Sequence, residues 1–315
     1  MSCVKPIEAF RGANGTVVFN RARSLSKVGF HVPCGQCIGC RLERARQWGL
    51  RCLHEAKCWP HNSFVTLTYS DEFLPEFGSL SLRDVQLFMK RLRKRKRASR
   101  SNPIRFFLGG EYGEHTLRPH YHAVLFNCAF ADKRVLSKKG DGECLYTSSE
   151  LSDCWSIDGK EIGHCTVGDV TMRSAQYCAK YALKKVTGEL AEDHYTVHDA
   201  DGVCYVRRPE FAVMSRRPGI GSDYFARFGN EYIVHDNVVV EGKEVRGTRF
   251  YDGRAEVFMG ADHSDDVLLC FCDVCVNKRL RKREALARAG DNTADRLLVK
   301  EKLMIAHLER KARRL

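Results

Sequence analysis

The alternation of strand and helix patterns between residues 63 and 186 constrains the fold of this 315-residue chain more than any other feature. Strands are indicated by four segments rich in β-branched and aromatic residues: FVTLTYS, IRFFLGG, HYHAVLFN and GHCTVGDV. Helices are indicated by SLRDVQLFMKRLRK, which Ser81 opens, TSSELSDCW and TMRSAQYCAKYALKKV. The order β-α-β-β-α-β-α predicts an α+β fold, an antiparallel sheet flanked by helices, close to the ferredoxin-like arrangement.

The segments on either side have other patterns. The first 60 residues contain a cysteine-rich motif followed by a helical pattern, and the end of the chain reads as a basic amphipathic helix interrupted near Gly290. Between them lie short strand-like pieces, such as YIVHDNVVVEG and RGTRFYDG, with Asp-Gly and Pro-Gly turns. We therefore predict four regions: a cysteine-rich N-terminal element and helix (1–60), a core (61–190), a β-rich extension (191–260) and a basic helical C-terminal region (261–315).

An excess of positive charge indicates a polyanionic partner. The chain has 52 Lys and Arg against 39 Asp and Glu, a formal net charge of +13. Membrane surfaces also attract basic proteins. However, no apolar run approaches the roughly 18 residues of a membrane-spanning helix, and the opening MSCVKPIEAF lacks the apolar stretch of a signal peptide. Nucleic acid is the partner that we expect, and no membrane.

Positive charge is concentrated in KRLRKRKRASR, residues 90–100, after an amphipathic helix. A solvated helix end would explain this run, but we favour contacts with backbone phosphates, which give affinity without reading sequence. The arginines of SRRPGIG are also placed to approach DNA, although a tight turn alone explains the glycines there. The predicted DNA-binding residues are Lys90, Arg91, Arg93, Lys94, Arg95, Lys96, Arg97, Arg216 and Arg217.

The 15 cysteines are odd in number and follow no secretion signal, so reduced thiols in a cytoplasm are expected rather than a disulfide framework. Three of them, in PCGQCIGC, have the C-x₂-C-x₂-C spacing of a metal knuckle. Structural zinc is the favoured ligand, ahead of an iron–sulfur cluster and of buried free thiols. The predicted zinc ligands are Cys34, Cys37, Cys40 and, as the fourth, Cys3, with His31, Cys52 or Cys58 as alternatives.

A second cysteine group lies in CFCDVC and comprises Cys270, Cys272 and Cys275. Its spacing is less regular than that of the first group, so no metal is assigned to it.

A histidine pair occurs in the strand segment LRPHYHAVLF. His120 and His122 project to the same side of a strand, with Val124 and Phe126 continuing that side toward the core. They are either hydrogen-bonded structural residues or half of a metal site. A third ligand is at hand in Glu111, just after the neighbouring strand, which reaches the pair if the two strands form a hairpin. Two imidazoles, one carboxylate and open positions suit Mg²⁺ or Mn²⁺ at a phosphate.

Two other residues of the connecting loop, Glu114 and His115, compete with Glu111 for the role of third ligand.

A pair of tyrosines lies in the helical segment AQYCAKYALKK. Tyr177 and Tyr181 are four residues apart and share a helix face, next to Lys180 and Lys184. Such a pair is common in helix packing. A tyrosine hydroxyl, with a pKa of about 10, is also a poor nucleophile unless its ionisation is assisted. A divalent metal on the target phosphate and a neighbouring lysine would supply that assistance.

These segments, taken in order, resemble a known family. The strand FVTLTYS, the histidine strand RPHYHAVLF and the tyrosine helix YCAKYALKK resemble those of the HUH endonucleases, which initiate rolling-circle replication. More closely, PCGQCIGCR, TLTYSDEFLP, GEYGEHTLRPHYH and SRRPGIGSDYF are similar to segments in replication initiators of small circular single-stranded DNA phages, in the gokushovirus branch of the microviruses. The resemblance extends from about residue 30 to 230, which is roughly two thirds of the chain.

The resemblance implies a fold and roles for individual residues. The core would be an HUH nuclease with a ferredoxin- or RRM-like sheet. The roles are metal binding for Glu111, His120 and His122, nucleophilic attack for Tyr177 and Tyr181, and positioning of metal or DNA for Lys180.

The implied activity is that of a metal-dependent endonuclease that also rejoins strands. It would nick single-stranded or origin DNA, form a 5′-phosphotyrosine and leave a free 3′-OH for rolling-circle replication. Its partners would be circular phage DNA, the replicative form, and a host helicase and DNA polymerase, in the cytoplasm of the bacterial host. Two alternatives stay open: a relaxase or transposase of the same fold, and a zinc-stabilised nucleic-acid-binding protein without catalysis.

Overall fold

The computed structural model describes residues 3–13, 16–25, 27–114, 116–138, 144–181, 190–198, 201–261 and 293–312. The chain forms two compact units, which are described one at a time. The smaller unit combines residues 1–44 with 256–315, and the larger unit comprises residues 45–255. Within the described ranges, no helix has the length and apolar character needed to cross a membrane.

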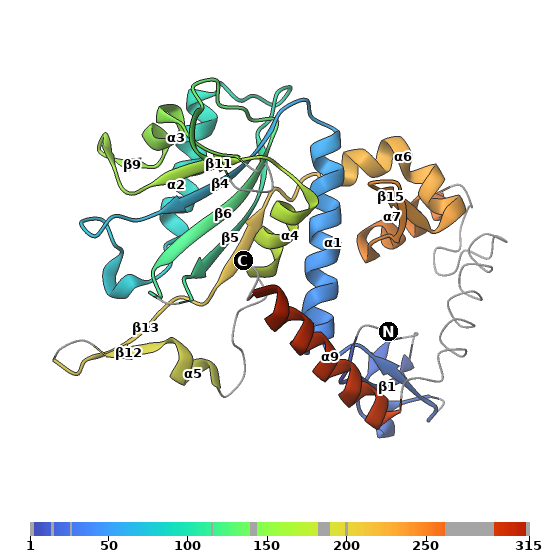
Figure 1. Ribbon diagram of the computed structural model, residues 1–315. Helices are drawn as coiled ribbons and strands as arrows, with labels where there is room; N and C mark the ends of the chain where they lie inside the picture. Colours follow the sequence, from blue (N-terminus) through green and yellow to red (C-terminus); the bar gives the residue numbers. More distant parts are fainter. Residues whose placement is uncertain are drawn as a thin grey trace. The chain divides into compact units, whose positions relative to one another are not determined.

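A seven-stranded antiparallel sheet forms the centre of the larger unit (Figure 1). Across the sheet the strands follow the order β14 (Phe211–Met214), β5 (Arg105–Tyr112), β6 (Pro119–Phe126), β4 (Asn62–Thr68), β11 (Cys165–Gly168), β8 (Cys144–Thr147) and β7 (Arg134–Lys138). The long strands β5, β6 and β4 are neighbours, and β5 and β6 form a hairpin. The longest ladders of the sheet therefore surround the segment that carries the histidine pair.

Both faces of the sheet are covered, because side chains alternate along each strand. One face packs Leu108, Ala123 and Leu125 against α2 (Leu82–Arg95) and α3 (Ser149–Cys154). The opposite face packs Phe107, Val124 and Phe126 against α1 (Ile38–Lys57) and α4 (Met172–Tyr181). Figure 1 shows these helices on the two sides of the strands. Val124 and Phe126 thus continue the side of the histidines into the core, as the sequence predicted.

Helix α2 illustrates how local sequence sets an element. Ser81 is its N-cap, and its hydroxyl accepts a hydrogen bond from the backbone N–H of Asp84 at 3.2 Å. Residues at helical spacing form one buried stripe: Val85, Phe88, Met89 and Leu92. The strands and helices predicted between residues 63 and 181 are all present, with small changes at their ends.

The segments after residue 190 differ from their sequence-based interpretation. The structure has α5 (Leu190–Tyr195), the hairpin of β12 (Thr196–His198) and β13 (Cys204–Val206), then α6 (Ser222–His235), the hairpin of β15 (Asn237–Val240) and β16 (Lys243–Arg246), and α7 (Arg249–Ala261). The start of YIVHDNVVVEG therefore belongs to a helix, and so does most of RGTRFYDG. In α6, Phe225, Gly229 and Tyr232 form a buried face at helical spacing, and this packing outweighs the strand propensity of the aromatic residues.

The smaller unit contains a three-stranded sheet and a long helix. The sheet has the order β2 (Val17–Val18), β1 (Ile7–Arg11) and β3 (Gly29–Val32), and the helix is α9 (Ala294–Ala312). The short 3₁₀ helix Arg21–Arg23 lies between β2 and β3. Helix α9 agrees with the predicted basic C-terminal helix, while Gly290 lies outside the described residues.

The coarse fold prediction is thus confirmed: an α+β chain with a large antiparallel sheet, flanking helices and a cysteine-rich N-terminus. Three additions to the sheet and its surroundings were not foreseen. They are the strands β7 and β8 at one edge, the strand β14 at the other edge, and the separate hairpin of β9 (Ser156–Ile157) and β10 (Lys160–Glu161).

Candidate metal and tyrosine site

The register of the β5–β6 hairpin brings the predicted carboxylate and histidines together. Glu111 lies directly opposite His120, and Gly109 lies opposite His122. Facing residues in an antiparallel pair project to the same side of the sheet, and residues two apart on one strand do so as well. The side chains of Glu111, His120 and His122 are therefore neighbours on one face.

The three side chains meet at one carboxylate oxygen. Oε1 of Glu111 lies 2.9 Å from Nε2 of His120 and 3.2 Å from Nε2 of His122. The side chains of Glu111 and His122 are buried, and that of His120 is 20% exposed. Burial on its own would raise the pKa of Glu111, but hydrogen bonds and positive charge from the two histidines lower it below its usual value. Glu111 is thus held as a carboxylate.

Both imidazoles are oriented through their other ring nitrogen. Nδ1 of His122 lies 3.0 Å from the hydroxyl of Thr66 on β4, and Nδ1 of His120 lies 3.2 Å from the carbonyl oxygen of Arg118. Histidines that ligate metals are usually fixed in this way, because the second hydrogen bond sets the ring orientation. The Nε2 atoms consequently face the carboxylate.

The donor set fits a divalent cation. The ligand atoms of Glu111, His120 and His122 all lie within 4.8 Å of one another. Two imidazole nitrogens and one carboxylate oxygen leave the remaining coordination positions of a six-coordinate ion open to water or substrate. Of the competing residues, Glu114 is exposed and outside this group, and His115 lies outside the described residues.

Tyr177 reaches the same site from helix α4. Its ring centroid is 5.0 Å from that of His122, the two rings being nearly perpendicular at 79°, and the residue is 40% exposed. Phe64 of β4 contacts both rings, with centroids 5.8 Å from His122 and 6.4 Å from Tyr177. Tyr177 therefore lies beside the histidines and is open to solvent on its other side.

The other two predicted members of the tyrosine segment are not placed at the level of side chains. Lys180 and Tyr181 belong to helix α4, but their side chains lie outside the described part of the structure, as does Lys184 altogether. Their roles remain predictions.

Close packing fixes α4 on the sheet. The thiol of Cys178 donates to the carbonyl oxygen of His122, with 3.0 Å between sulfur and oxygen. On the facing strand, a Cβ at Gly109 would lie 3.0 Å from the carbonyl oxygen of Cys178. On the side of α1, a Cβ at Gly49 would lie 2.4 Å from Cγ of Gln176. Two glycines therefore allow the approach that puts Tyr177 next to His122.

The basic run at the end of α2 is partly occupied by contacts inside the larger unit. Arg91 donates to the carbonyl oxygen of Cys154 at 2.8 Å, and Arg93 donates to that of Ile104 at 3.2 Å. Ion pairs join Arg95 to Asp153 at 2.9 Å and Lys96 to Glu150 at 2.6 Å. These contacts orient the four side chains within the fold.

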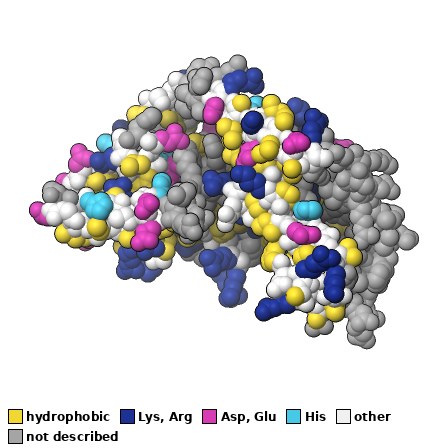
Figure 2. Space-filling model, turned by 90° about the horizontal axis from the view of Figure 1, so that it is seen from below, with side chains coloured by type: hydrophobic (Ala, Val, Ile, Leu, Met, Phe, Trp, Pro, Cys, Tyr) yellow, Lys and Arg dark blue, Asp and Glu magenta, His cyan; other side chains and the backbone are white. Residues whose placement is uncertain are grey.

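The remaining basic residues of the prediction are exposed: Lys90, Lys94, Arg97, Arg216 and Arg217. On the coloured part of the face drawn in Figure 2, Lys and Arg gather in several separate groups with acidic residues among them, rather than in one continuous band. Phosphate binding by these residues remains a prediction.

The structure also assembles the predicted cysteine group. The sulfurs of Cys3, Cys34, Cys37 and Cys40 all lie within 4.8 Å of one another, and Cys3 is thus the fourth member. The alternative Cys52 instead packs among Phe107, Val124 and Ala175. His31 and Cys58 are not in the group either. Cys270, Cys272 and Cys275 lie outside the described residues.

Two supporting residues of the site, Thr66 and Phe64, were missed from the sequence. Both lie on β4, where Thr66 is opposite His122 and Phe64 is opposite Val124. The signal that could have found them is the pairing of the FVTLTYS strand with the histidine strand, which periodicity alone does not reveal.

Comparison with known proteins gives consistent matches. A family model for the replication-associated protein ORF2 matches residues 62–186, a stretch that contains Glu111, His120, His122 and Tyr177. The replication-associated protein VP4 of Bdellovibrio phage phiMH2K is 38% identical over 200 residues, which cover 62% of this chain and 61% of that relative. The replication-associated protein ORF2 of Spiroplasma virus 4 is 32% identical over 279 residues, which cover 81% of each chain.

A more distant relative is the replication-associated protein ORF4 of Chlamydia phage 1. It is 24% identical over 242 residues, which cover 75% of this chain and 56% of that relative. No solved structure matches the chain.

Proposed function

Because this chain belongs to the ORF2 family of replication-associated proteins, we propose that it initiates phage DNA replication by cutting one DNA strand with a tyrosine. The observation that carries the proposal is the placement of the Tyr177 ring beside His122, in contact with the Glu111, His120 and His122 group. A potential nucleophile and a potential cation site thus occupy the same face of one sheet. The substrate is single-stranded or origin DNA of a circular phage genome.

The proposed reaction exchanges one phosphodiester for another. The phenolic oxygen of Tyr177 forms a bond to a backbone phosphorus, and the bond from that phosphorus to the 3′ oxygen breaks. The phenolic proton is lost, and the leaving 3′ oxygen gains a proton to become a 3′-OH. The products are a 5′-phosphotyrosine and a free 3′ end, with no redox change.

The cation site supplies the electrostatic part of the chemistry. Glu111, His120 and His122 would hold Mg²⁺ or Mn²⁺, which when bound withdraws charge from phosphoryl oxygens. Thr66 and the carbonyl oxygen of Arg118 keep the imidazole rings oriented for that role. Lys180, one residue before Tyr181 on α4, would offset negative charge that develops on the DNA.

The fold supports the HUH core that this chemistry implies. The central strands have the order β5-β6-β4-β11, and α2 and α3 pack on the same face. This is the strand order and helix placement of a ferredoxin- or RRM-like β-α-β-β-α-β unit. Helix α4 follows that unit and covers the other face, where it presents Tyr177 to the histidines.

Later steps would involve partners and the second tyrosine. The free 3′ end would prime a host DNA polymerase, and Tyr181 would cut when the origin is regenerated, so that the released 3′ end rejoins the first strand. The sequence contains no G-x-x-x-x-G-K-[ST] motif, so we assign unwinding of the replicative form to a host helicase. Exposed residues such as Lys94 and Arg216 would contact phosphates, in the cytoplasm of the host bacterium.

Metal-dependent formation of a covalent protein–DNA band tests the proposal. Purified protein is mixed with labelled single-stranded DNA that carries the origin, with Mn²⁺ or Mg²⁺, and run on a denaturing gel with and without chelator. We expect a protease-sensitive band that chelator removes. In the His122→Ala variant, Mn²⁺ affinity measured by calorimetry should fall by more than about 100-fold, because a direct ligand is lost rather than one of its supports.

The matched control is His235→Ala, which removes an exposed histidine at the end of α6. It should bind Mn²⁺ and form the band like the native protein. Tight DNA binding without a covalent band on several origin substrates would instead favour a non-catalytic, zinc-stabilised binding protein. Cutting at transfer-origin or transposon-end sequences in preference to phage origins would favour a relaxase or transposase.

A glycine substitution tests whether α4 must approach the sheet closely. In Gly109→Val, the new side chain meets the carbonyl oxygen of Cys178, which is backbone and cannot rotate away. A shift of α4 moves Tyr177, so the rate of band formation should fall by roughly 100-fold, while Mn²⁺ binding is kept. Gly253→Ala is the control, because a Cβ there meets nothing within 4 Å. An unchanged rate in Gly109→Val would show that the position of α4 does not limit cutting.

A further inference from the structure

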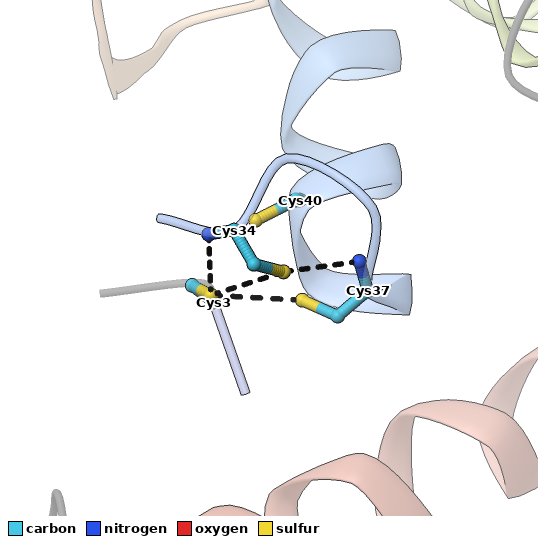
Figure 3. Close-up of side chains that lie close together, drawn as sticks. All are labelled: Cys3, Cys34, Cys37 and Cys40. Atoms are coloured by element: carbon cyan, nitrogen blue, oxygen red, sulfur yellow. Dashed lines mark hydrogen bonds between the residues drawn. The ribbon is translucent and has the colours of Figure 1, made fainter. Parts of the chain in front are cut away.

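Strand pairing in the smaller unit explains why Cys3 joins a motif 31 residues away. Strands β1 and β3 are antiparallel, with Ile7 opposite Val32. Cys3 precedes the start of β1 and Cys34 follows the end of β3, so both lie at the same end of the sheet. Cys37 and Cys40 follow at the start of α1, and the turn between them folds back over the same point (Figure 3).

The spacing of the sulfurs matches a single tetrahedral ion. Sγ of Cys3 lies 3.7 Å from Sγ of Cys34 and 3.7 Å from Sγ of Cys37. Four sulfurs at about 2.3 Å from one zinc ion are separated from each other by roughly 3.8 Å. A disulfide would need the two sulfurs at about 2.05 Å, so these cysteines are not paired covalently. The four thiols are arranged around a common centre.

Backbone N–H groups point at three of these sulfurs. The N–H of Cys34 donates to Cys3, that of Cys37 donates to Cys34, and that of Val4 donates to Cys37, at 3.3, 3.3 and 3.4 Å between nitrogen and sulfur. Hydrogen bonds to a charged group stabilise its charged form. A cluster of neutral thiols gains little from such donors, whereas thiolates bound to a cation are stabilised by them.

We infer that Cys3, Cys34, Cys37 and Cys40 form a closed zinc site with four thiolate ligands. Cys3, Cys37 and Cys40 are buried, so protein ligands fill the tetrahedron and no position is left for substrate. A four-iron cluster fits less well, because its ligand sulfurs surround four ions rather than one and stand farther apart. The site is structural, and it is independent of the cutting reaction proposed above.

The zinc site also holds the two ends of the described chain together. Met304 of α9 packs against the buried cluster of Cys3, Val4, Cys37 and Cys40. Beside it, Lys5 forms an ion pair with Glu301 of α9, with 3.2 Å between nitrogen and oxygen. The N-terminal segment and α9 therefore share a small core whose centre is the cysteine group. We expect zinc removal to loosen α9 as well as the N-terminal sheet.

Metal content of the full-length protein tests the site. The protein is expressed with added zinc and purified under reducing conditions, and zinc and iron are measured by mass spectrometry. We expect about one zinc ion per chain and no iron. To separate this ion from any metal at the histidines, the same measurement on the His120→Ala, His122→Ala double variant should give the same zinc content. Absence of zinc from both proteins, or stoichiometric iron, would overturn the inference.

Cobalt and a single cysteine variant identify the ligands. Cobalt-loaded protein should show the intense visible bands of a tetrahedral site and the charge-transfer bands of four thiolates. Cys3→Ser should weaken the charge-transfer bands and bind zinc at least about 10-fold more weakly. Cys204→Ser, which changes an exposed cysteine outside the cluster, should behave like the native protein. An unchanged spectrum in Cys3→Ser would remove Cys3 from the site.

Hydrogen exchange tests the connection to α9. After zinc is removed by a chelator, amides of β1, β3 and α9 should lose protection together. Amides of β4, β5 and β6 in the larger unit should keep theirs. If α9 exchanges at the same rate with and without zinc, the zinc site does not hold that helix.

Discussion

The Tyr177→Phe variant is expected to form no covalent band with origin DNA, a loss of at least about three orders of magnitude in rate. The substitution removes only the phenolic oxygen, which is the proposed nucleophile. The ring that contacts His122 and Phe64 stays in place, so folding and Mn²⁺ binding should be unchanged. The measurement is the denaturing gel used for the native protein, with Mn²⁺ affinity measured by calorimetry on the same preparation.

Two other tyrosine variants make this result specific. Tyr146→Phe changes a tyrosine of β8 near the edge of the sheet and should form the band normally. Tyr181→Phe should still make the first cut, although it should fail to complete strand transfer after a full round of synthesis. If Tyr177→Phe forms the band and Tyr181→Phe does not, the order of the two nucleophiles is the reverse of the one proposed. If the double variant still forms the band, neither tyrosine is the nucleophile.

Substitution of Glu55 by Ala should destabilise the larger unit by about 3–5 kcal/mol. The carboxylate of Glu55 is fully buried in α1 and forms an ion pair with Arg105 of β5, with 2.5 Å between oxygen and nitrogen. It also accepts hydrogen bonds from the indole N–H of Trp59 at 3.1 Å and from the backbone N–H of Gly221 at 2.7 Å. Its removal leaves a buried guanidinium without its counter-charge and leaves two further donors unsatisfied.

Urea unfolding followed by tryptophan fluorescence measures this effect. The three tryptophans of the chain, Trp48, Trp59 and Trp155, all belong to the larger unit, so the signal reports on that unit. Glu72→Ala, which changes an exposed glutamate, should alter the free energy of unfolding by no more than about 0.5 kcal/mol.

A double variant, Glu55→Leu with Arg105→Met, tests the electrostatic explanation. Because it removes both charges, it should recover a large part of the loss. A double variant no more stable than Glu55→Ala would indicate that the hydrogen bonds to Trp59 and Gly221, rather than the ion pair, dominate.

The sequence was sufficient where the determining interactions are local. Ser81 was identified as the start of α2 because an N-cap depends on residues within one turn. The hairpin that joins Glu111 to the histidines was foreseen because a short loop separates two clear strand patterns. The side shared by His120 and His122 follows from strand geometry alone.

Long-range interactions determine the parts that the sequence did not reveal. β14 is added to the sheet beside β5, about 100 residues earlier in the chain, and no local pattern encodes that pairing. Helices α6 and α7 contain aromatic and β-branched residues that favour strands, and their helical form depends on buried faces supplied by the rest of the larger unit. The division into four regions, the DNA contacts and the roles of Lys180 and Tyr181 remain predictions.

The β5–β6 hairpin has a consequence for the order in which the site is completed. Glu111 and His120 are only nine residues apart, so the carboxylate and the histidines meet as soon as the hairpin forms. Tyr177 lies much later in the chain, and it reaches His122 only after α4 has been synthesised and has docked between β5 and α1. An incomplete chain leaving the ribosome therefore has its cation ligands before it has a nucleophile. The growing polypeptide is thus unable to attach itself to DNA until its core is finished.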